Sequence, residues 1–590
     1  MKENTTMKNL LPFTGNSIIE LIRFRTQHQT DDVAYIHIKD KKDKKETITY
    51  GEFEQRIKKL AAKLQLYDVQ GERIVLMYPS GIDYIVAYFA VIFSGAIAVP
   101  VYEPRQSNHL NRLTNILEDA SPKLLLMSDK TVTVTNQELM NELTGYGAEL
   151  LITDQPEFKL PPAESWQPVS LENNDIVFLQ YTSGSTGNPK GVMVSNGNIL
   201  HNSQKILHAT EPDASFCCVS WLPPYHDMGL IGGLIQPLYA GYPCIIMSPI
   251  SVIQRPIKLL KAIHEYKATI SGGPNFIFDA CVNRIRDKQL EGIDLSSWRI
   301  AFNGAEPINA HTIKRFSDRF KQYGFDENAH YPCYGMAEST LFISGSRVKN
   351  GAVVRRFDKK SLQNDHAKPA TQSNTQMLVS SGYISQNMDI KIINPENNIE
   401  CKEFQVGEVW IRGDSVAQGY WKQEEKPGED FSGMIKGKNK HRYLRTGDLA
   451  FFCENELFIT GRIKDVIIIH GKNYYPQDIE YSITNAHPEI KPGSGAAFSV
   501  DHEGNERLVI LQELNHRLDE HQKSEIREII RSEISQHHEV QILDIAFISP
   551  GRLPKTTSGK IQRQASKTVY LTEYYSDFIQ TSQFGLIANF

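Results

Sequence analysis

The chain has 590 residues, too many for a single hydrophobic core, so we expect several domains. Hydrophobic residues make up 40% of it and charged residues 23%, a globular composition that excludes a disordered, collagen-like or coiled-coil chain. The net charge of -5 leaves no basic excess for a nucleic acid backbone, so no nucleic acid partner is expected.

The N-terminal sequence and the cysteines both indicate a cytoplasmic protein. MKENTTMKNLLPFTGNS lacks the apolar core and the small-residue cleavage site of a secretory signal. The cysteines number 7 and include no C-x-x-C pair, so we expect reduced thiols rather than disulfides or a zinc site.

The first elements along the chain are a hairpin and a very apolar segment. The charged run at 39–46 separates YIHI from TITY and is interpreted as a solvated hairpin turn. Residues 85–101 are nearly long enough to span a bilayer, but Ser94, Gly95 and Pro100 interrupt them. We therefore expect a buried helix, a glycine stop and a buried strand, and no membrane span.

Short apolar segments alternate with helical patterns, and no long repeat is visible. These segments, at 73–79, 96–102, 123–128 and 244–249, predict an α/β fold of layered units with substantial parallel sheet. A polar stretch at 346–378 has no sustained period and is expected to be irregular.

After 461–471 the chain becomes charged and helix-rich, which predicts a domain boundary. Residues 512–540 are expected to form an amphipathic helical region on the outer face of a small α/β domain. His537 and His538 are adjacent and point to different helix faces, so we expect no metal site there.

The strongest chemical signal is YTSGSTGNPKG at 181–191, which follows an apolar strand. Glycines permit close backbone approach, consecutive N–H groups bind anions, and hydroxyls with Lys190 supply donors for an oligophosphate. The Walker A spacing is absent because Pro189 and Gly191 flank this lysine. The segment therefore predicts a phosphate loop of another lineage.

This loop resembles the signature of the adenylate-forming superfamily, which includes acyl-CoA synthetases, nonribosomal adenylation domains and luciferases. Four further motifs follow in the family's order: YGMAE at 334–338, RTGD at 445–448, GRIKDVIIIHGKNYYPQDIE at 461–480 and LPKTTSGKIQR at 553–563. The resemblance implies an N-terminal adenylation domain at 1–461, built of layered α/β subdomains plus a β-barrel-like subdomain. It further implies a hinge at 462–466, pivoting at Lys464, and a small mobile C-terminal α/β domain at 467–590.

The resemblance also implies roles for single residues. Lys560 would bridge the carboxylate and the α-phosphate, a charge pair of about 4 kcal/mol before desolvation. Glu338, with Thr186, would hold Mg2+, because this ion prefers one or two carboxylates plus phosphate oxygens. Asp448 would accept from the ribose hydroxyls and Arg462 would contact ribose or phosphate. The remaining ATP contacts would come from Thr182, Ser183, Gly184, Ser185, Gly187 and Lys190, with Tyr334, Gly335, Met336, Asn303, Gly304 and Ala305 around adenine.

The segment HDMGL at 226–230 resembles the fatty acyl-AMP ligase branch of this superfamily, as does an insertion at about 348–378 that is thought to restrain the small domain. His226 is counted with the catalytic residues and with the acyl contacts. Met228, Ile231, Phe276 and Phe278 are candidates for the wall of an acyl tunnel, although such residues are often simple core.

The sequence therefore predicts an enzyme that uses ATP and Mg2+ to convert a medium- to long-chain fatty acid to acyl-adenylate and pyrophosphate. The acceptor would be the phosphopantetheine of a separate acyl carrier protein. A fatty acyl-CoA synthetase and a noncatalytic acyl-adenylate-binding protein remain alternatives. A serine hydrolase is excluded because G-x-S-x-G is absent.

Overall fold

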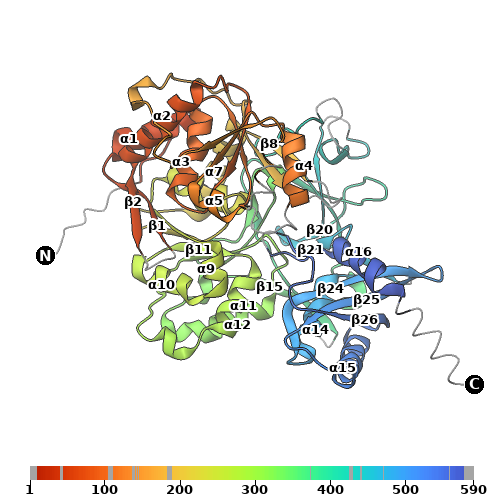
Figure 1. Ribbon diagram of the computed structural model, residues 1–590. Helices are drawn as coiled ribbons and strands as arrows, with labels where there is room; N and C mark the ends of the chain where they lie inside the picture. Colours follow the sequence, from red (N-terminus) through yellow and green to blue (C-terminus); the bar gives the residue numbers. More distant parts are fainter. Residues whose placement is uncertain are drawn as a thin grey trace, which may run out of the picture.

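The computed structural model describes residues 10–39, 44–103, 110–135, 140, 143, 145–182, 189–371, 374–423, 429–438, 441–469, 471–556, 559–576 and 578. A large N-terminal domain carries a smaller C-terminal domain at one side (Figure 1). The expected α/β fold with two domains is confirmed.

The first layer is a six-stranded sheet in the order β6-β5-β3-β4-β7-β8, parallel except for the antiparallel pair β7 and β8. Its strands are β3 (Arg73–Met77), β4 (Ile97–Pro100), β5 (Leu124–Met127), β6 (Glu149–Ile152), β7 (Ile176–Thr182) and β8 (Lys190–Ser195). Its helices are α2 (Tyr50–Gln65), α3 (Ile82–Phe93), α4 (Leu110–Ala120) and α5 (Asp129–Val134), preceded in the chain by α1 (Ile18–Gln29).

The most apolar segment is the expected helix, stop and strand. Every side chain of α3 except Asp83 is buried, Gly95 has φ +83° in the turn that follows, and β4 lies inside the six-stranded sheet. No helix in the described part of the chain is both long and apolar enough to cross a membrane.

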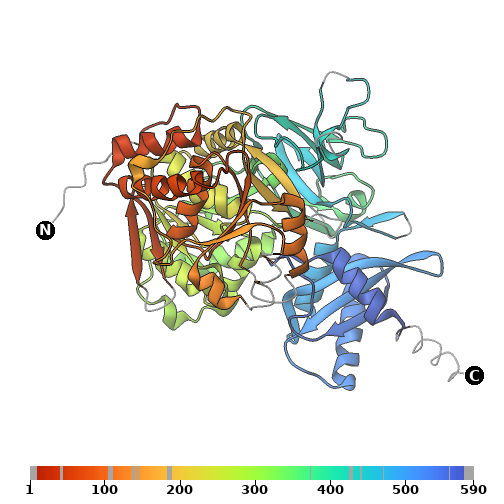
Figure 2. The same cartoon turned by 45° about the horizontal axis from the view of Figure 1, so that its top comes forward.

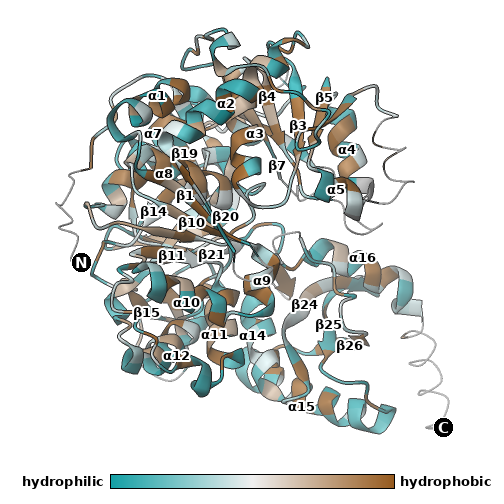
Figure 3. Cartoon of the chain, turned by 60° about the vertical axis from the view of Figure 1, so that its left-hand side comes forward, coloured by the Kyte–Doolittle hydropathy of each residue, from teal (hydrophilic) through white to brown (hydrophobic). Residues whose placement is uncertain are grey.

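The second layer is a nine-stranded sheet in the order β17-β14-β13-β12-β11-β9-β10-β1-β2. Its strands are β1 (Val33–Ile38), β2 (Lys45–Thr49), β9 (Cys218–Ser220), β10 (Cys244–Met247), β11 (Ile270–Gly273), β12 (Ile300–Asn303), β13 (His330–Gly335), β14 (Phe342–Gly345) and β17 (Tyr383–Ile384). Residues Ile38 and Lys45 pair, so β1 and β2 form the expected hairpin. Apolar strands lie inside and polar helix faces outside (Figure 3).

Helices cover this sheet and connect its strands. They are α7 (Asn196–Thr210), the π-helix η3 (Met228–Ile235), α8 (Gln236–Ala240), α9 (Pro249–Gln254), α10 (Ile257–Tyr266), α11 (Asn275–Arg284) and α12 (Ala310–Phe320). Short 3-10 turns are η2 (Ala163–Ser165), η4 (Asp287–Leu290), η5 (Lys321–Tyr323), η6 (Glu327–Ala329), η7 (Ala337–Ser339) and η8 (Glu429–Phe431).

A four-stranded antiparallel sheet stands where the β-barrel-like subdomain was expected. It consists of β18 (Met388–Ile393), β19 (Gly407–Gly413), β20 (Leu444–Cys453) and β21 (Glu456–Arg462). Beside it, the insertion is more regular than its sequence predicted, because β15 (Val354–Asp358) and β16 (Thr375–Val379) pair around α13 (Lys359–Leu362). The buried side chains of Phe357 and Leu362 anchor this hairpin in a core that the polar composition concealed.

The C-terminal domain has its own sheets and core (Figure 2). It contains β22 (Ile467–Ile469), β23 (Lys472–Tyr474), α14 (Pro476–Ala486), β24 (Ile490–His502), β25 (Asn505–Leu514), α15 (Glu520–His538), β26 (Ile542–Ile548) and α16 (Arg563–Glu573). The helix expected at 512–540 begins only at Glu520. A capping box of Asp519 and Gln522 starts it there, and Gln512 belongs to β25.

Candidate functional site

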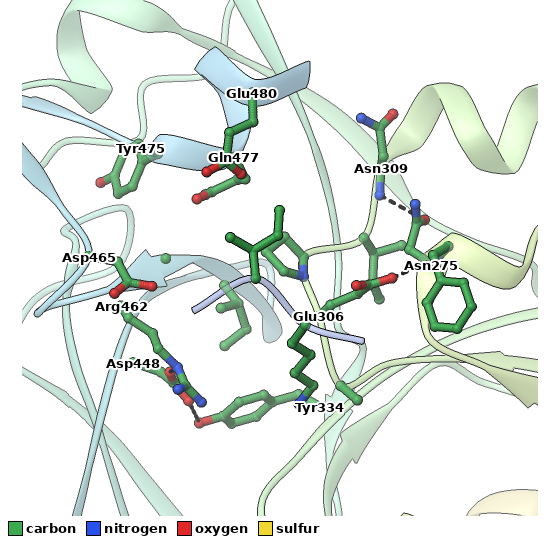
Figure 4. Close-up of a pocket in the computed structure, with 18 of the residues that line it drawn as sticks. Asn275, Glu306, Asn309, Tyr334, Asp448, Arg462, Asp465, Tyr475, Gln477 and Glu480 are labelled. Atoms are coloured by element: carbon green, nitrogen blue, oxygen red, sulfur yellow. Dashed lines mark hydrogen bonds and ion pairs between the residues drawn. The ribbon is translucent and has the colours of Figure 1, made fainter. Parts of the chain in front are cut away.

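A cavity of about 2930 Å3 lies where the two domains meet. Its lining includes residues at the carboxyl ends of β12, β13 and β21 and at the start of α14 (Figure 4). Lys555, Thr556, Gly559 and Lys560 of the C-terminal domain line the same space. Because carboxyl ends of parallel strands are where open α/β sheets bind ligands, this cavity is the candidate active site.

Tyr334 and Arg462 hold the carboxylate of Asp448 from two sides (Figure 4). The Tyr334 hydroxyl donates to Oδ2 at 2.7 Å, and Nε of Arg462 donates to Oδ1 at 3.0 Å. Asp448 and Arg462 are directly paired across β20 and β21. Burial, and then the neighbouring carboxylate, raise the pKa of Tyr334, which therefore stays a neutral donor.

The turn before Asp448 is shaped by a second buried carboxylate. Glu408 accepts from the backbone N–H of Gly447 at 3.0 Å and from Nε of Arg445 at 3.2 Å. Gly447 has φ +70°, a conformation that favours glycine. Glu408 thus holds the turn of the RTGD motif through these two hydrogen bonds. Asp448, the last residue of the motif, lines the cavity.

The segment Asn303, Gly304 and Ala305 stands at the end of β12. A side chain at Gly304 would approach the backbone oxygen of Cys333 to 2.9 Å, so this position requires glycine. The Asn303 amide donates to Oδ1 of Asn275 at 3.3 Å, while its own buried Oδ1 has no partner within the described structure. Ala305 is exposed to the cavity and has φ +69°.

Lys560 comes from the far end of the chain and lines the same cavity. Its loop is closed by hydrogen bonds from the Thr556 N–H to the Lys560 oxygen, at 2.7 Å, and from the Lys560 N–H to the Thr556 hydroxyl, at 3.0 Å. Burial lowers the pKa of Lys560, and the charges of Asp227 and Glu306 oppose this shift. A cation from the C-terminal domain thus faces carboxylates of the N-terminal domain.

Arg563, three residues after the lysine, ties its loop to the hinge region. The guanidinium binds Glu480 through Nε and Nη2, both at 2.8 Å, and Asp465 through Nη1 at 3.0 Å. Gln564 donates to the backbone oxygen of Lys464 at 3.0 Å, and the Lys464 side chain is exposed. The lysine loop and the segment 462–466 therefore form one connected unit.

The phosphate loop is described only at its edges. Thr182 and Lys190 pair across β7 and β8 and line the cavity, whereas Ser183, Gly184, Ser185, Thr186 and Gly187 lie outside the described residues. The Lys190 ammonium lies 3.5 Å from Oδ2 of Asp430 and 4.4 Å from the ring centre of Tyr420.

Glu338 lies on η7 and lines the cavity close to Tyr420, whose hydroxyl donates to Oε1 at 3.1 Å. Burial raises the pKa of Glu338. In the described part of the chain no three His, Cys, Asp or Glu side chains gather as a metal site. A hard cation at Glu338 would therefore need phosphate oxygens as further ligands, which suits Mg2+.

Of the four candidates for the acyl wall, two line the cavity and two do not. Met228 and Phe276 line the cavity. Ile231 and Phe278 are fully buried in separate cores and do not line the described cavity, so the structure does not bring them to the site. Phe278 instead stacks on Trp298 with ring centres 6.4 Å apart. The sequence alone could not show whether an apolar side chain near the site faces the cavity or packs in the core.

His226 lines the cavity beside these residues. Burial lowers its pKa to about 3, and the charges of Lys560 and Arg112 add to the shift. The imidazole is therefore neutral near pH 7.

The insertion contacts the C-terminal domain at several points. Gln376 donates to Asp478 at 2.5 Å, and the Asn473 side chain donates to Asp365 at 2.9 Å. The Asn473 N–H binds the oxygen of Gln363 at 3.1 Å. The insertion thus holds α14 and β23 in the observed arrangement.

Four residues at the site were not predicted from sequence: Asp227, Glu306, Tyr420 and Arg563. Asp227 lies within HDMGL at 226–230 and Glu306 directly follows Ala305, but the sequence gave neither carboxylate a role. Only the folded chain brings Glu306, near β12, to the lysine of a different domain.

The AMP-binding enzyme model matches residues 23–421, which is more than half of the chain. The chain belongs to the AMP-binding enzyme family. A second model, the Disco-interacting protein 2-like AMP domain, matches residues 464–580. The first match lies in the large domain and the second in the small domain.

Relatives of this family member match over nearly their whole length. The medium-chain-fatty-acid–[acyl-carrier-protein] ligase JamA of Moorena producens is 36% identical, over 94% of this chain and 95% of JamA. The putative fatty-acid–CoA ligase fadD25 of Mycobacterium tuberculosis is 33% identical, over 95% of this chain and 98% of its own.

Solved structures place this AMP-binding enzyme in the fatty acyl-AMP ligase branch. The fatty acid AMP ligase of Legionella pneumophila is 39% identical with a TM-score of 0.73, over 95% of this chain and 96% of that chain. A structure from the study of fatty acyl-adenylate ligases of E. coli and L. pneumophila is 29% identical with a TM-score of 0.86, over 95% and 99%.

Proposed function

We propose that the chain activates a medium- to long-chain fatty acid with ATP and passes the acyl group to the phosphopantetheine thiol of a separate acyl carrier protein. In the first step a carboxylate oxygen bonds to the α-phosphorus while the bond to the β-phosphate breaks, giving acyl-adenylate and pyrophosphate. In the second the thiol replaces AMP on the acyl carbon. The main observation behind this proposal is that Lys560 of the C-terminal domain lines the same cavity as Asp448 of the RTGD motif.

Lys560 would neutralise the two anions as they approach. One such pair at about 4 Å and an effective dielectric near 20 contributes on the order of 4 kcal/mol before desolvation. Burial lowers the pKa of Lys560, and the charges of Asp227 and Glu306 oppose this shift and so favour the protonated lysine. Neutral His226 would line the junction of acyl group and phosphate without adding charge.

The nucleotide would lie between the ends of β12 and β13. Tyr334, with Gly335 and Met336, would form one wall of the adenine site, and Asn303, Gly304 and Ala305 the other. Asp448 would accept from the ribose hydroxyls while Arg462 holds its orientation. Thr182 and Lys190 would support the phosphate loop at 183–188.

Glu338 would hold Mg2+ together with phosphate oxygens, with Thr186 as the hydroxyl near it. When bound, this ion would offset negative charge on the leaving pyrophosphate. The Tyr420 hydroxyl keeps the Glu338 carboxylate oriented toward the cavity.

The two steps would need different arrangements of the domains 1–461 and 467–590. Rotation about 462–466 at Lys464 would withdraw Lys560 after the first step. Contacts from the insertion at 348–378 would restrain the arrangement that CoA requires, so a carrier protein is favoured over CoA. We also propose a cytoplasmic location, since all 7 cysteines are free thiols.

Product analysis tests the proposal. The protein is incubated with ATP, Mg2+ and a panel of fatty acids, with CoA, with a phosphopantetheinylated carrier protein or with neither, and the products are identified by mass spectrometry. We expect acyl-adenylate in all arms and thioester mainly with the carrier. Efficient acyl-CoA formation would favour the synthetase alternative, and adenylate binding without turnover would favour a noncatalytic protein.

A further inference from the structure

From the nucleotide end, the lining of the cavity extends to a set of apolar residues, and we call this part of the cavity the apolar branch. Along its floor, side chains from one face of the neighbouring strands line it: Ile270 of β11, Ile300 and Phe302 of β12, and Tyr331 and Cys333 of β13. These alternate positions share one side of the sheet. Since Ile270, Ile300 and Tyr331 lie at the strand starts, the branch runs nearly the length of the strands, away from the nucleotide end.

The opposite wall of this branch comes from η3 and α8. Met228, Gly232 and Gln236 all line the cavity, and their spacing of four is close to one turn of the π-helix, so they lie along one side of it. Met228 follows Asp227 at the lysine end. Gln236 lies about two turns further along this helix. The Gln236 amide is therefore at the deep end of the branch.

Gln236 has an unusual environment for an amide. Its exposed fraction is 1%, and neither Nε2 nor Oε1 has a hydrogen-bond partner within the described structure. Buried polar groups are nearly always paired, so an unpaired donor and acceptor on a residue that lines the cavity point to a ligand group that carries both. A hydroxyl group does so, whereas a plain methylene chain carries neither.

We propose that Gln236 is a specificity-determining residue that recognises a hydroxyl group within the acyl chain, so that hydroxylated fatty acids are the preferred substrate class. The hydroxyl donates to Oε1 and accepts from Nε2 at the deep end of the branch. This inference rests on the proposed fatty acid activation, because it assigns the branch to the acyl chain. No covalent step is added to the reaction.

The test compares dodecanoic acid with monohydroxydodecanoic acids that carry the hydroxyl at successive carbons. ATP–pyrophosphate exchange gives kcat/KM for each acid with the full-length protein. We expect one isomer to exceed dodecanoic acid by about tenfold, as one net hydrogen bond permits. A preference for dodecanoic acid over every isomer would overturn the inference.

Gln236→Leu, with Gln236→Met as a second variant of similar volume, is expected to remove that preference. Ser203→Ala is the matched control, because Ser203 is also buried with an unpaired hydroxyl but does not line the cavity. An unchanged preference in both Gln236 variants would overturn the assignment. Exchange with dodecanoic acid but no isomer preference would leave the proposed function standing, whereas no exchange with any acid would overturn both.

Discussion

Gln376 of the insertion donates a hydrogen bond of 2.5 Å to Asp478 of α14, which joins the large and the small domain across 102 positions of sequence. With the contacts of Asn473, it fixes α14 and β23 against the hairpin of β15 and β16. Any rotation of the C-terminal domain must break these bonds.

We predict that Gln376→Ala combined with Asn473→Ala allows acyl-CoA formation. Loss of two net hydrogen bonds of about 1 kcal/mol each raises the population of the released arrangement by about tenfold or more. Mass spectrometry with CoA measures the thioester. Lys368→Ala, an exposed change in the same insertion, is the control. The prediction fails if the double variant makes no more acyl-CoA than this control. Deleting 355–370 is a less clean test because it removes core residues Phe357 and Leu362.

The buried carboxylate of Asp478 predicts that the stability of the protein depends on pH. Burial raises the pKa of Asp478 to about 7, whereas an unfolded aspartate titrates near about 3.9. Between these values the folded protein retains a proton that the unfolded chain releases, so this residue's contribution to stability falls as pH rises through that window. Asp478→Asn should therefore gain stability relative to the wild type on going from about pH 5 to about pH 8. Urea unfolding measures this, and an equal difference at both pH values would refute it.

Asp448→Asn should weaken ATP use without unfolding the protein. Its carboxylate accepts from Tyr334 and Arg462, and a hydrogen bond to a charged group contributes about 1.5 to 3 kcal/mol. We expect kcat/KM for ATP to fall by about tenfold to a hundredfold. Tyr334→Phe, which keeps the ring, should lose less. ATP–pyrophosphate exchange at varied ATP concentration measures both constants. An unchanged KM for ATP would contradict the assigned ribose contact.

Arg563→Met should destabilise the lysine loop. It leaves Glu480 and Asp465 partly buried without their cation, a change that costs about 3 to 5 kcal/mol in buried pairs. Arg552→Met, at an exposed arginine 4.0 Å from Glu573, is the matched control and should be nearly neutral. Hydrogen exchange at 553–563 and pyrophosphate exchange should both change in the first variant only. Equal protection in the two variants would contradict the anchoring role.

Much of the fold was predictable because its signals are local. The break at Gly95 follows from chain chemistry, and the strands at 73–79 and 123–128 follow from short apolar runs between helical patterns. The regular hairpin of the insertion was missed, since its few core residues, such as Phe357, are hidden among polar ones. Roles that depend on distant contacts, such as those of Glu306 and Arg563, required the folded chain.

The residues proposed for the acyl wall show the same limit at a finer scale. Met228 and Phe278 are both apolar residues near predicted motifs, yet one faces the cavity and the other stacks on Trp298. Gln236 carries no sequence signal at all, and only its burial without partners distinguishes it.

Lys560→Ala tests the central claim most directly, because it removes the one cation that the C-terminal domain is proposed to deliver between carboxylate and α-phosphate. Pyrophosphate exchange with dodecanoic acid should fall by about a thousandfold, as loss of about 4 kcal/mol in the transition state requires. Circular dichroism and the melting temperature should stay those of the wild type. Exchange at the wild-type rate in a folded Lys560→Ala protein would contradict the account.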